Sequence, residues 1–191
     1  WNQQEKSLRV TADEERIFLA NNGNYQTSPS FLRSFYRGLS NGSDLRPVLS
    51  SELLNLADWN TYFGMSLNGE RLAFTRVQKV SDSGYQEQLW AVSGDGQVAK
   101  QIRALPQGSF DTSPGGSDLN GDGSAYIGKV NNTIQKIPTD GFSAETILLS
   151  AAEVGDGRLG DLIFSPDRNL ILVPVYIDQR TDYFVINTVT G

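Results

Sequence analysis

The sequence contains no histidine and no cysteine, and these two absences exclude more functions than any residue that is present. Without these residues there is no Ser-His-Asp or Cys-His catalysis, no disulfide bond, and no zinc or haem site built on either of them. The absence of cysteine suits the cytoplasm as well as an oxidising compartment, so it does not locate the protein. The catalytic arrangement that is left to consider is a pair of carboxylates.

Long apolar runs and an excess of positive charge are also absent. The longest candidate run, residues 170–177, is interrupted by Pro174 and is far shorter than the roughly 20 residues of a membrane-spanning helix. Lys and Arg number 16 against 22 Asp and Glu, which gives a net charge of -6. Nucleic-acid binding needs a basic surface, so we expect neither a nucleic-acid partner nor a membrane span.

Four segments of the 191-residue chain share one pattern, in which Asp or Asn opens a polar turn and an apolar strand follows. These turns begin at positions 13, 68, 120 and 167, at intervals of 55, 52 and 47 residues. Asp and Asn bond their own backbone and tolerate left-handed dihedral angles, so they favour such turns. A strand directly after the turn indicates a hairpin, and a period near 50 residues is typical of propeller blades.

The rest of each repeat supplies further short strands, and long helical periodicity is absent. Third strands are expected at residues 31–37, 88–93, 133–137 and 182–187, and fourth strands at 45–49, 98–102 and 145–149. The sequence therefore predicts an all-β fold, a β-propeller of about four four-stranded antiparallel blades, the last lacking its outer strand. The blades cover approximately residues 1–50, 51–105, 106–150 and 151–191 of a single propeller domain or propeller fragment.

Two of the repeats are similar to a known family. Residues 164–167 read Phe-Ser-Pro-Asp and are followed by the apolar segments 170–173 and 183–186, which resembles the TolB-type propeller repeat. Residues 68–74 fit the same pattern. Arg168 stands where that family usually has Gly, and neither the separate N-terminal domain of TolB nor the hydrolase domain of the propeller peptidases is present. The resemblance implies a propeller in a bacterial envelope or extracellular setting, and it implies little about function.

The predicted blades leave two open flanks. The first repeat begins with its inner strand and the fourth ends before its outer one, whereas closed propellers usually join both ends within one blade. Unpaired edges of this kind invite pairing with another chain. We therefore expect either a piece of a longer propeller or a domain that closes alone or by self-association.

The acidic turn at residues 118–124 is the sharpest candidate for a metal site. Asp118, Asn120 and Asp122 offer oxygen ligands at alternate positions, a Gly completes the turn, and the Ser124 carbonyl would add a fourth ligand, as at the start of a calcium loop. The twelfth position of that loop is Lys129, where an EF-hand has Glu. The alternative is an ordinary blade turn that needs no metal.

Carboxylates and aromatic residues near the predicted inner strands supply the remaining candidates. Asp111, Asp118 and Asp161 are candidates from which two could form a glycosidase pair, or they could be solvated loop residues. Trp59 and Tyr62 precede the second inner strand, where exposed rings bind sugars or peptides and buried rings pack between blades.

These observations predict a non-enzymatic binding or scaffold propeller whose partner is a protein or a small ligand, periplasmic or extracellular, without a catalytic residue or an organic cofactor. One alternative is an accessory propeller fragment of a peptidase-type or carbohydrate-active enzyme. Another is a calcium-stabilised adhesion module, with calcium bound at residues 118–124.

Overall fold

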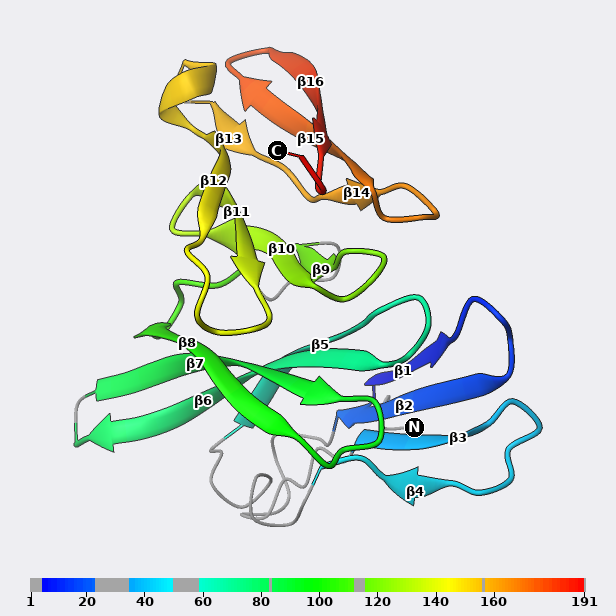
Figure 1. Ribbon diagram of the computed structural model, residues 1–191. Coiled ribbons are helices and arrows are strands. Elements are labelled where there is room, and N and C mark those ends of the chain that lie inside the picture. Colours follow the sequence, from blue (N-terminus) through cyan, green and yellow to red (C-terminus); the bar gives the residue numbers. More distant parts are fainter. Residues whose placement is uncertain are drawn as a thin grey trace.

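The computed structural model describes residues 5–22, 35–49, 59–82, 84–111, 116–155 and 157–190 (Figure 1). These residues form four antiparallel sheets, each built from strands that are consecutive in the sequence. Their only helical element is the 3-10 turn η1, Ala152–Val154, and none of their helices is long and apolar enough to cross a membrane. The described chain is therefore an all-β propeller of four blades, as predicted.

The first three blades are four-stranded meanders. Blade 1 contains β1 (Glu5–Val10), β2 (Arg16–Asn22), β3 (Phe35–Leu39) and β4 (Arg46–Pro47). Blade 2 contains β5 (Trp59–Met65), β6 (Arg71–Ser81), β7 (Gly84–Ser93) and β8 (Ala99–Pro106). Blade 3 contains β9 (Ser117–Leu119), β10 (Ala125–Val130), β11 (Thr133–Pro138) and β12 (Thr146–Ser150).

Blade 4 has three strand positions instead of four. It consists of β13 (Arg158–Leu159), β14 (Ile163–Phe164), β15 (Leu170–Ile177) and β16 (Arg180–Asn187). Both β13 and β14 pair with the same edge of β15, so they form one interrupted inner strand, while β16 occupies the opposite edge. Within the described residues no strand pairs with the outer side of β16, which confirms the prediction that the outer strand is lacking.

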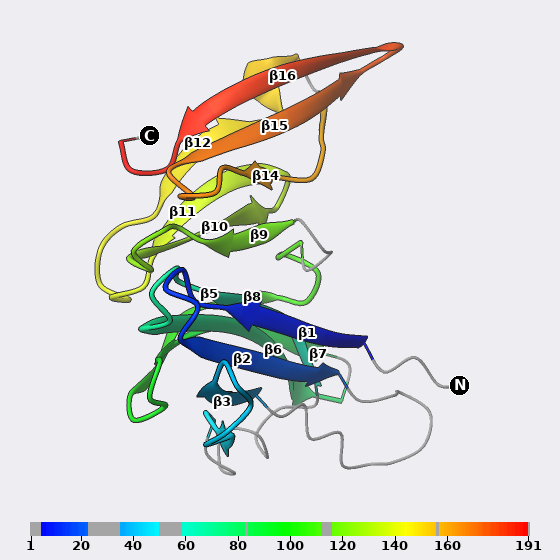
Figure 2. The same ribbon diagram turned by 90° about the vertical axis from the view of Figure 1, so that its right-hand side faces the viewer.

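The blades follow one another along a curved row, with blade 1 at one end and blade 4 at the other (Figures 1 and 2). Three apolar clusters lie between neighbouring blades. The largest fully buried side chains include Phe18, Leu72 and Phe74 between blades 1 and 2, and Leu119 and Tyr126 between blades 2 and 3. Because an inner blade is covered on both faces, its strands are apolar on both faces, as the nearly continuous burial of β10 shows.

Along one side of the row, hydrogen bonds join the turns of blades 1, 2 and 3. The Ala12 amide in blade 1 donates to the Leu67 carbonyl in blade 2 at 2.7 Å, and the Leu67 amide donates to the Gly121 carbonyl in blade 3 at 3.0 Å. Gly121 itself lies so close to blade 4 that a Cβ atom would come within 2.4 Å of the Asp167 carbonyl oxygen. Glycine is therefore required at this position, because no larger residue fits between the two turns.

Candidate functional site

The same two side chains close the turn at the start of every blade. The first is Thr11, Ser66, Asn120 or Ser165, whose oxygen accepts the amide hydrogen of the residue five positions later at 3.0, 3.0, 2.9 and 3.0 Å. The second is Asp13, Asn68, Asp122 or Asp167, whose oxygen accepts the amide hydrogen two residues later at 3.1, 3.0, 2.9 and 3.1 Å. We call these four turns the corners.

The third corner begins two residues away from the position that the sequence pattern predicted. Asn120 occupies the place of Ser66, and Asp122 rather than Asn120 matches Asn68. Asn can replace Ser here because its side-chain oxygen reaches the same backbone amide. The residue after each second position has a positive φ, 76° at Gly123 and 57° at Arg168, so the corner needs a residue that tolerates the left-handed region.

Hydrogen bonds lower the pKa of the corner carboxylates. For Asp167 the main cause is the hydroxyl of Ser165, followed by the backbone amide of Asn169. For Asp122 the main cause is the backbone amide of Ser124. These donors stabilise the charged form of the carboxylate, so the corner holds its negative charge by hydrogen bonds from its own chain.

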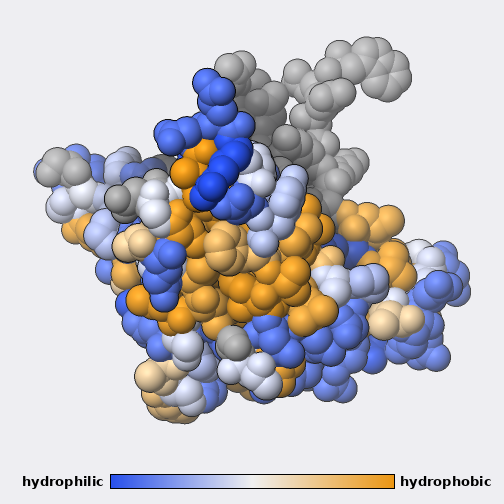
Figure 3. All heavy atoms as spheres, turned by 90° about the horizontal axis from the view of Figure 1, so that it is seen from above, coloured by the Kyte–Doolittle hydropathy of each residue, from blue (hydrophilic) through white to orange (hydrophobic). Residues whose placement is uncertain are grey.

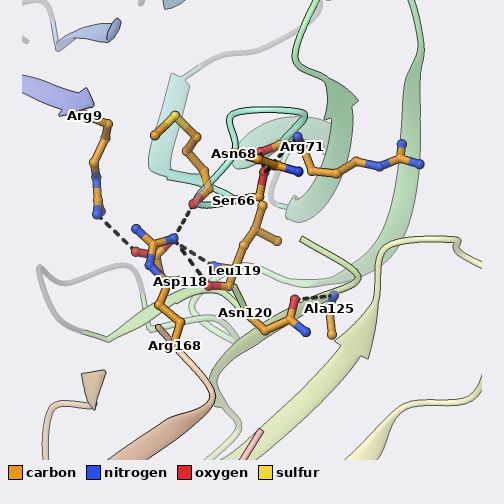
Figure 4. Close-up of polar contacts among 10 residues, drawn as sticks. Arg9, Ser66, Asn68, Arg71, Asp118, Leu119, Asn120, Ala125 and Arg168 are labelled. Carbon is orange, nitrogen blue, oxygen red and sulfur yellow. Dashed lines mark hydrogen bonds and ion pairs between the residues drawn. The ribbon is translucent and has the colours of Figure 1, made fainter. Parts of the chain in front are cut away.

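The four residues of the predicted calcium site have different partners. Asn120 Nδ2 donates to Ser124 Oγ at 3.0 Å, its Oδ1 accepts from the Ala125 amide, and Asp122 accepts from the Ser124 amide. Asp118 instead pairs with arginines of two other blades (Figure 4). Asn120, Asp122 and Ser124 thus share one corner that Asp118 does not join, and the described residues include no cluster of three or more acidic side chains arranged for a metal.

Asp118 connects blade 3 to blades 1 and 4. Its side chain is only 8% exposed, and its two oxygens pair with Arg9 Nη1 at 3.1 Å and Arg168 Nη1 at 3.3 Å. Arg168 also donates to the carbonyl of Met65 in blade 2. Figure 4 shows the two guanidinium groups on either side of the Asp118 carboxylate. Arg9, Asp118 and Arg168 thus link blades 1, 3 and 4 at this carboxylate, and Arg168 extends the link to blade 2.

The contacts of Arg168 explain why a residue other than Gly can stand at this position of the corner. It has the left-handed backbone that Gly usually supplies, with a φ of 57°, which costs a non-Gly residue conformational energy. Its side chain, only 12% exposed, reaches Asp118 and the Met65 carbonyl. The contacts made by a long cationic side chain thus offset the backbone strain.

An open groove of about 500 Å³ lies at the opposite end of blade 3 from its corner. Its lining comes from residues 108–111 of the β8–β9 connection, from Lys129 at the end of β10 with the turn 131–132 in blade 3, and from Arg158 and Leu159 of β13 in blade 4. Its lining is mainly polar and carries both charges. We call it the Lys129 groove.

Lys129 is the central cation of this groove. Its ammonium group pairs with Asp111, and with Asp161 at 3.4 Å, while its own side chain is 13% exposed. Asp111 and Asp161, two of the three carboxylates that the sequence analysis named, thus contact the same lysine. The third, Asp118, pairs with Arg9 and Arg168 instead. Whether two of these carboxylates act as a glycosidase pair stays a prediction.

A buried glutamate holds the loop that forms one wall of the groove. Glu87 of β7 is 3% exposed, and its Oε2 accepts the amide hydrogens of Gly108 and Phe110, both at 3.2 Å. The Asp111 amide then donates to the Lys129 carbonyl at 2.9 Å. Neither Glu87 nor Lys129 was singled out as a groove residue from the sequence. On one face of β7 the alternate residues Tyr85, Leu89 and Ala91 are apolar, and Glu87 interrupts them. This interruption is the signal that could have identified Glu87.

The aromatic candidates fall in two groups. Trp59 and Tyr62 belong to β5, but their side chains lie outside the described residues, so their role stays a prediction. Trp90, in β7, stacks on Phe74 with the ring centroids 6.3 Å apart, and the Arg76 guanidinium lies 4.5 Å from its ring centroid. This ring packs between blades.

The fold and these contacts define a β-propeller with a corner network at one end and a polar groove at the other. No protein-family model and no curated protein sequence matches the chain. Solved structures of β-propeller enzymes do match it, each at 12% identity. At this identity the similarity concerns the fold alone.

Three of these structures can be compared directly. An oligogalacturonate lyase in complex with manganese has a TM-score of 0.57, with 91% of this chain and 45% of that chain covered. A puromycin hydrolase has a TM-score of 0.56, with 97% and 29% covered. The GH74 enzyme of Niastella koreensis has a TM-score of 0.55, with 94% and 27% covered. The chain thus spans less than half the length of each of them.

Proposed function

We propose that this chain is a non-catalytic propeller module that binds a protein segment or a small polar ligand in the Lys129 groove. The observation that carries the proposal is the groove itself, because blades 3 and 4 and the β8–β9 connection form its walls and it displays Lys129, Arg158 and Asp111 together. Binding sites on rigid scaffolds are commonly formed by the loops at one end. A groove of both charges suits a ligand with hydroxyl, amide or carboxylate groups.

The absence of catalysis is supported by the ion pairs of the inner carboxylates. Asp111 and Asp161 share Lys129, and Asp118 lies between two arginines. A general acid or base must reach a proton of the substrate, and carboxylates paired with cations of their own fold are poorly placed for that part. The chain also has no histidine or cysteine that could take that part.

Binding can be tested with defined oligosaccharides and peptides. Oligogalacturonate and a set of tetrapeptides carrying either charge are titrated calorimetrically into the wild type, Lys129→Met and Lys79→Met. Lys79 pairs with Asp82 on the surface of the hairpin between β6 and β7, so it serves as the matched control. We expect saturable binding of one of these probes that K129M weakens by about tenfold or more and K79M leaves unchanged. Equal binding by all three proteins, or no binding of any probe, would contradict the proposal.

A second candidate function is that of an accessory propeller in a larger enzyme. The similarity to enzymes more than twice as long favours it. In that case the groove would hold or guide the substrate of a catalytic part elsewhere in the protein. The test is to purify the full-length gene product and assay it for lyase and hydrolase activity. An activity that a substitution outside residues 1–191 abolishes would favour this alternative.

The TolB-type resemblance of residues 164–167 supports the proposal of a periplasmic or extracellular setting. Calcium is not required by the proposed function, because the oxygens of Asn120 and Asp122 already accept hydrogen bonds. We expect the melting temperature to be the same in calcium and in chelator. A higher melting temperature in calcium than in chelator would instead favour the adhesion module, since a ligand that binds only the folded state raises its stability.

A further inference from the structure

The outward face of blade 4 is an apolar sheet surface, and no other sheet of the described residues packs on it. Leu170, Tyr176, Tyr183 and Val185 on this face are 43%, 41%, 63% and 67% exposed. They belong to the two long strands β15 and β16, where Tyr183 lies opposite Pro174 and Val185 lies opposite Leu172. Figure 3, which looks onto this end of the molecule, shows a broad hydrophobic area there. A contiguous patch of this kind marks an interaction surface.

The other face of the same strands packs against blade 3, with β15 fully buried at its centre and Phe184 and Ile186 of β16 partly buried. Ile171, Val173 and Val175 are 0% exposed and pack with Ile127 and Ile134 of blade 3. Each blade in the row repeats this arrangement, since apolar clusters join blades 1 and 2, blades 2 and 3, and blades 3 and 4. The outward face of blade 4 continues this series of interfaces, so its natural occupant is another blade.

Blade 1 presents the complementary end of the series. Leu8 and Val10 of β1 are 59% and 46% exposed, and Val10 lies opposite Ile17 of β2. Phe18, on the other face of β2, is 1% exposed and packs with Met65 and Leu72 of blade 2. Among the residues that the structure describes, blade 1 therefore uses one face toward blade 2 and presents apolar side chains on the other, as blade 4 does.

From this continuity we infer that the blade 4 face binds the blade 1 face of a second copy of this chain. Two copies joined twice in this head-to-tail way have eight blades, the upper limit of the usual propeller range. The four blades cover 45% of the oligogalacturonate lyase chain, so two copies would amount to about one such propeller. A head-to-tail interface must close on itself to give a finite assembly, and a ring of two copies satisfies this condition. This inference does not depend on the Lys129 groove.

The test is the mass of the 191-residue chain in solution, measured by light scattering after size exclusion. We expect twice the 21.0 kDa mass of one chain. Val185→Lys and Val10→Lys, on the two proposed faces, should each raise the dimer dissociation constant by about tenfold or more. Val98→Lys is the matched control, because Val98 is 60% exposed in the β7–β8 turn, outside both faces.

The outcomes separate this dimer from other arrangements. A monomeric chain overturns the inference and points to a further blade of a longer chain as the occupant. A dimer that V185K weakens and V10K does not is a face-to-face pair of blade 4 surfaces, which also overturns it. Circular dichroism of each variant shows whether it is folded. If V185K does not fold, Tyr183→Arg takes its place, since Tyr183 lies on the same face with 63% of its side chain exposed.

Discussion

The two ends of blade 3 are built in different ways. At the corner, Asn120 and Asp122 bond backbone amides five and two residues later. At the groove, Glu87 bonds amides 21 and 23 residues later, and Lys129 reaches Asp161 32 residues later. The corner is thus specified by its own few residues, whereas the groove exists only when three blades have come together. A polar cluster of the second kind is more sensitive to changes elsewhere in the fold, and it is also the better candidate for a site.

Asp118→Asn is expected to have the largest effect on stability among single changes of polar residues. Asp118 is nearly buried between Arg9 and Arg168, and removal of its charge leaves two guanidinium groups without their common partner. We expect the free energy of unfolding to fall by about 3 kcal/mol, measured by urea denaturation. Asp182→Asn is the control, because Asp182 pairs with Arg180 on the surface and should cost less than about 1 kcal/mol. Equal effects of D118N and D182N would contradict the role of Asp118 in joining the blades.

Glu87→Gln tests the groove end. The buried carboxylate accepts two amide hydrogens of the groove wall, and an amide oxygen accepts them more weakly. We expect a loss of about 2 kcal/mol in the same measurement, together with faster hydrogen exchange at Gly108 and Phe110. Glu145→Gln removes a surface partner of Arg103 and provides the comparison. Unchanged exchange at those two amides would show that Glu87 does not hold the loop.

Ser66→Ala tests the corner end. Ser66 is 0% exposed, and its hydroxyl accepts the Arg71 amide and donates to Asn68 Oδ1. We expect a loss of about 1 kcal/mol, measured by denaturation, and no change at the groove, because the bonds are local. Ser165→Ala removes the same bonds at a corner that is exposed to water, so its effect should be smaller. A larger effect of S165A would mean that burial does not determine the value of a corner.

Loss of the Asp140 charge in acid is expected to have the smallest effect on stability. Hydrogen bonds from the Ser143 hydroxyl and the Phe142 and Ser143 amides lower the pKa of Asp140 to about 2, and an unfolded Asp has a pKa of about 3.9. The unfolded chain therefore binds a proton first, and the stability that Asp140 contributes is present above about pH 4 and lost as the pH falls towards 2. Melting temperatures between pH 5 and 2 should fall less steeply for Asp140→Asn than for the wild type, and parallel curves would contradict this.

The same contrast explains what the sequence could predict. The four blades and their corners follow from patterns that lie within about ten residues, so they were predictable. The shift by two residues at Asn120 arose because Asn can perform the task of Ser66 as well as that of Asn68. The Lys129 groove was not predictable, because nothing near Lys129 in the sequence indicates that Asp111 and Asp161 meet there. The interruption between β13 and β14 was also missed.

The bonds between successive corners have a consequence for how such a chain can change. Ala12 and Leu67 donate from the same place in their turns to the carbonyl of the next blade, so blades 1, 2 and 3 are joined by one standard connection. Duplication or deletion of one whole blade would leave matching connections at the junction, whereas a shorter insertion inside a turn would break them. The number of blades is accordingly the feature of this architecture that can vary at the lowest energetic cost.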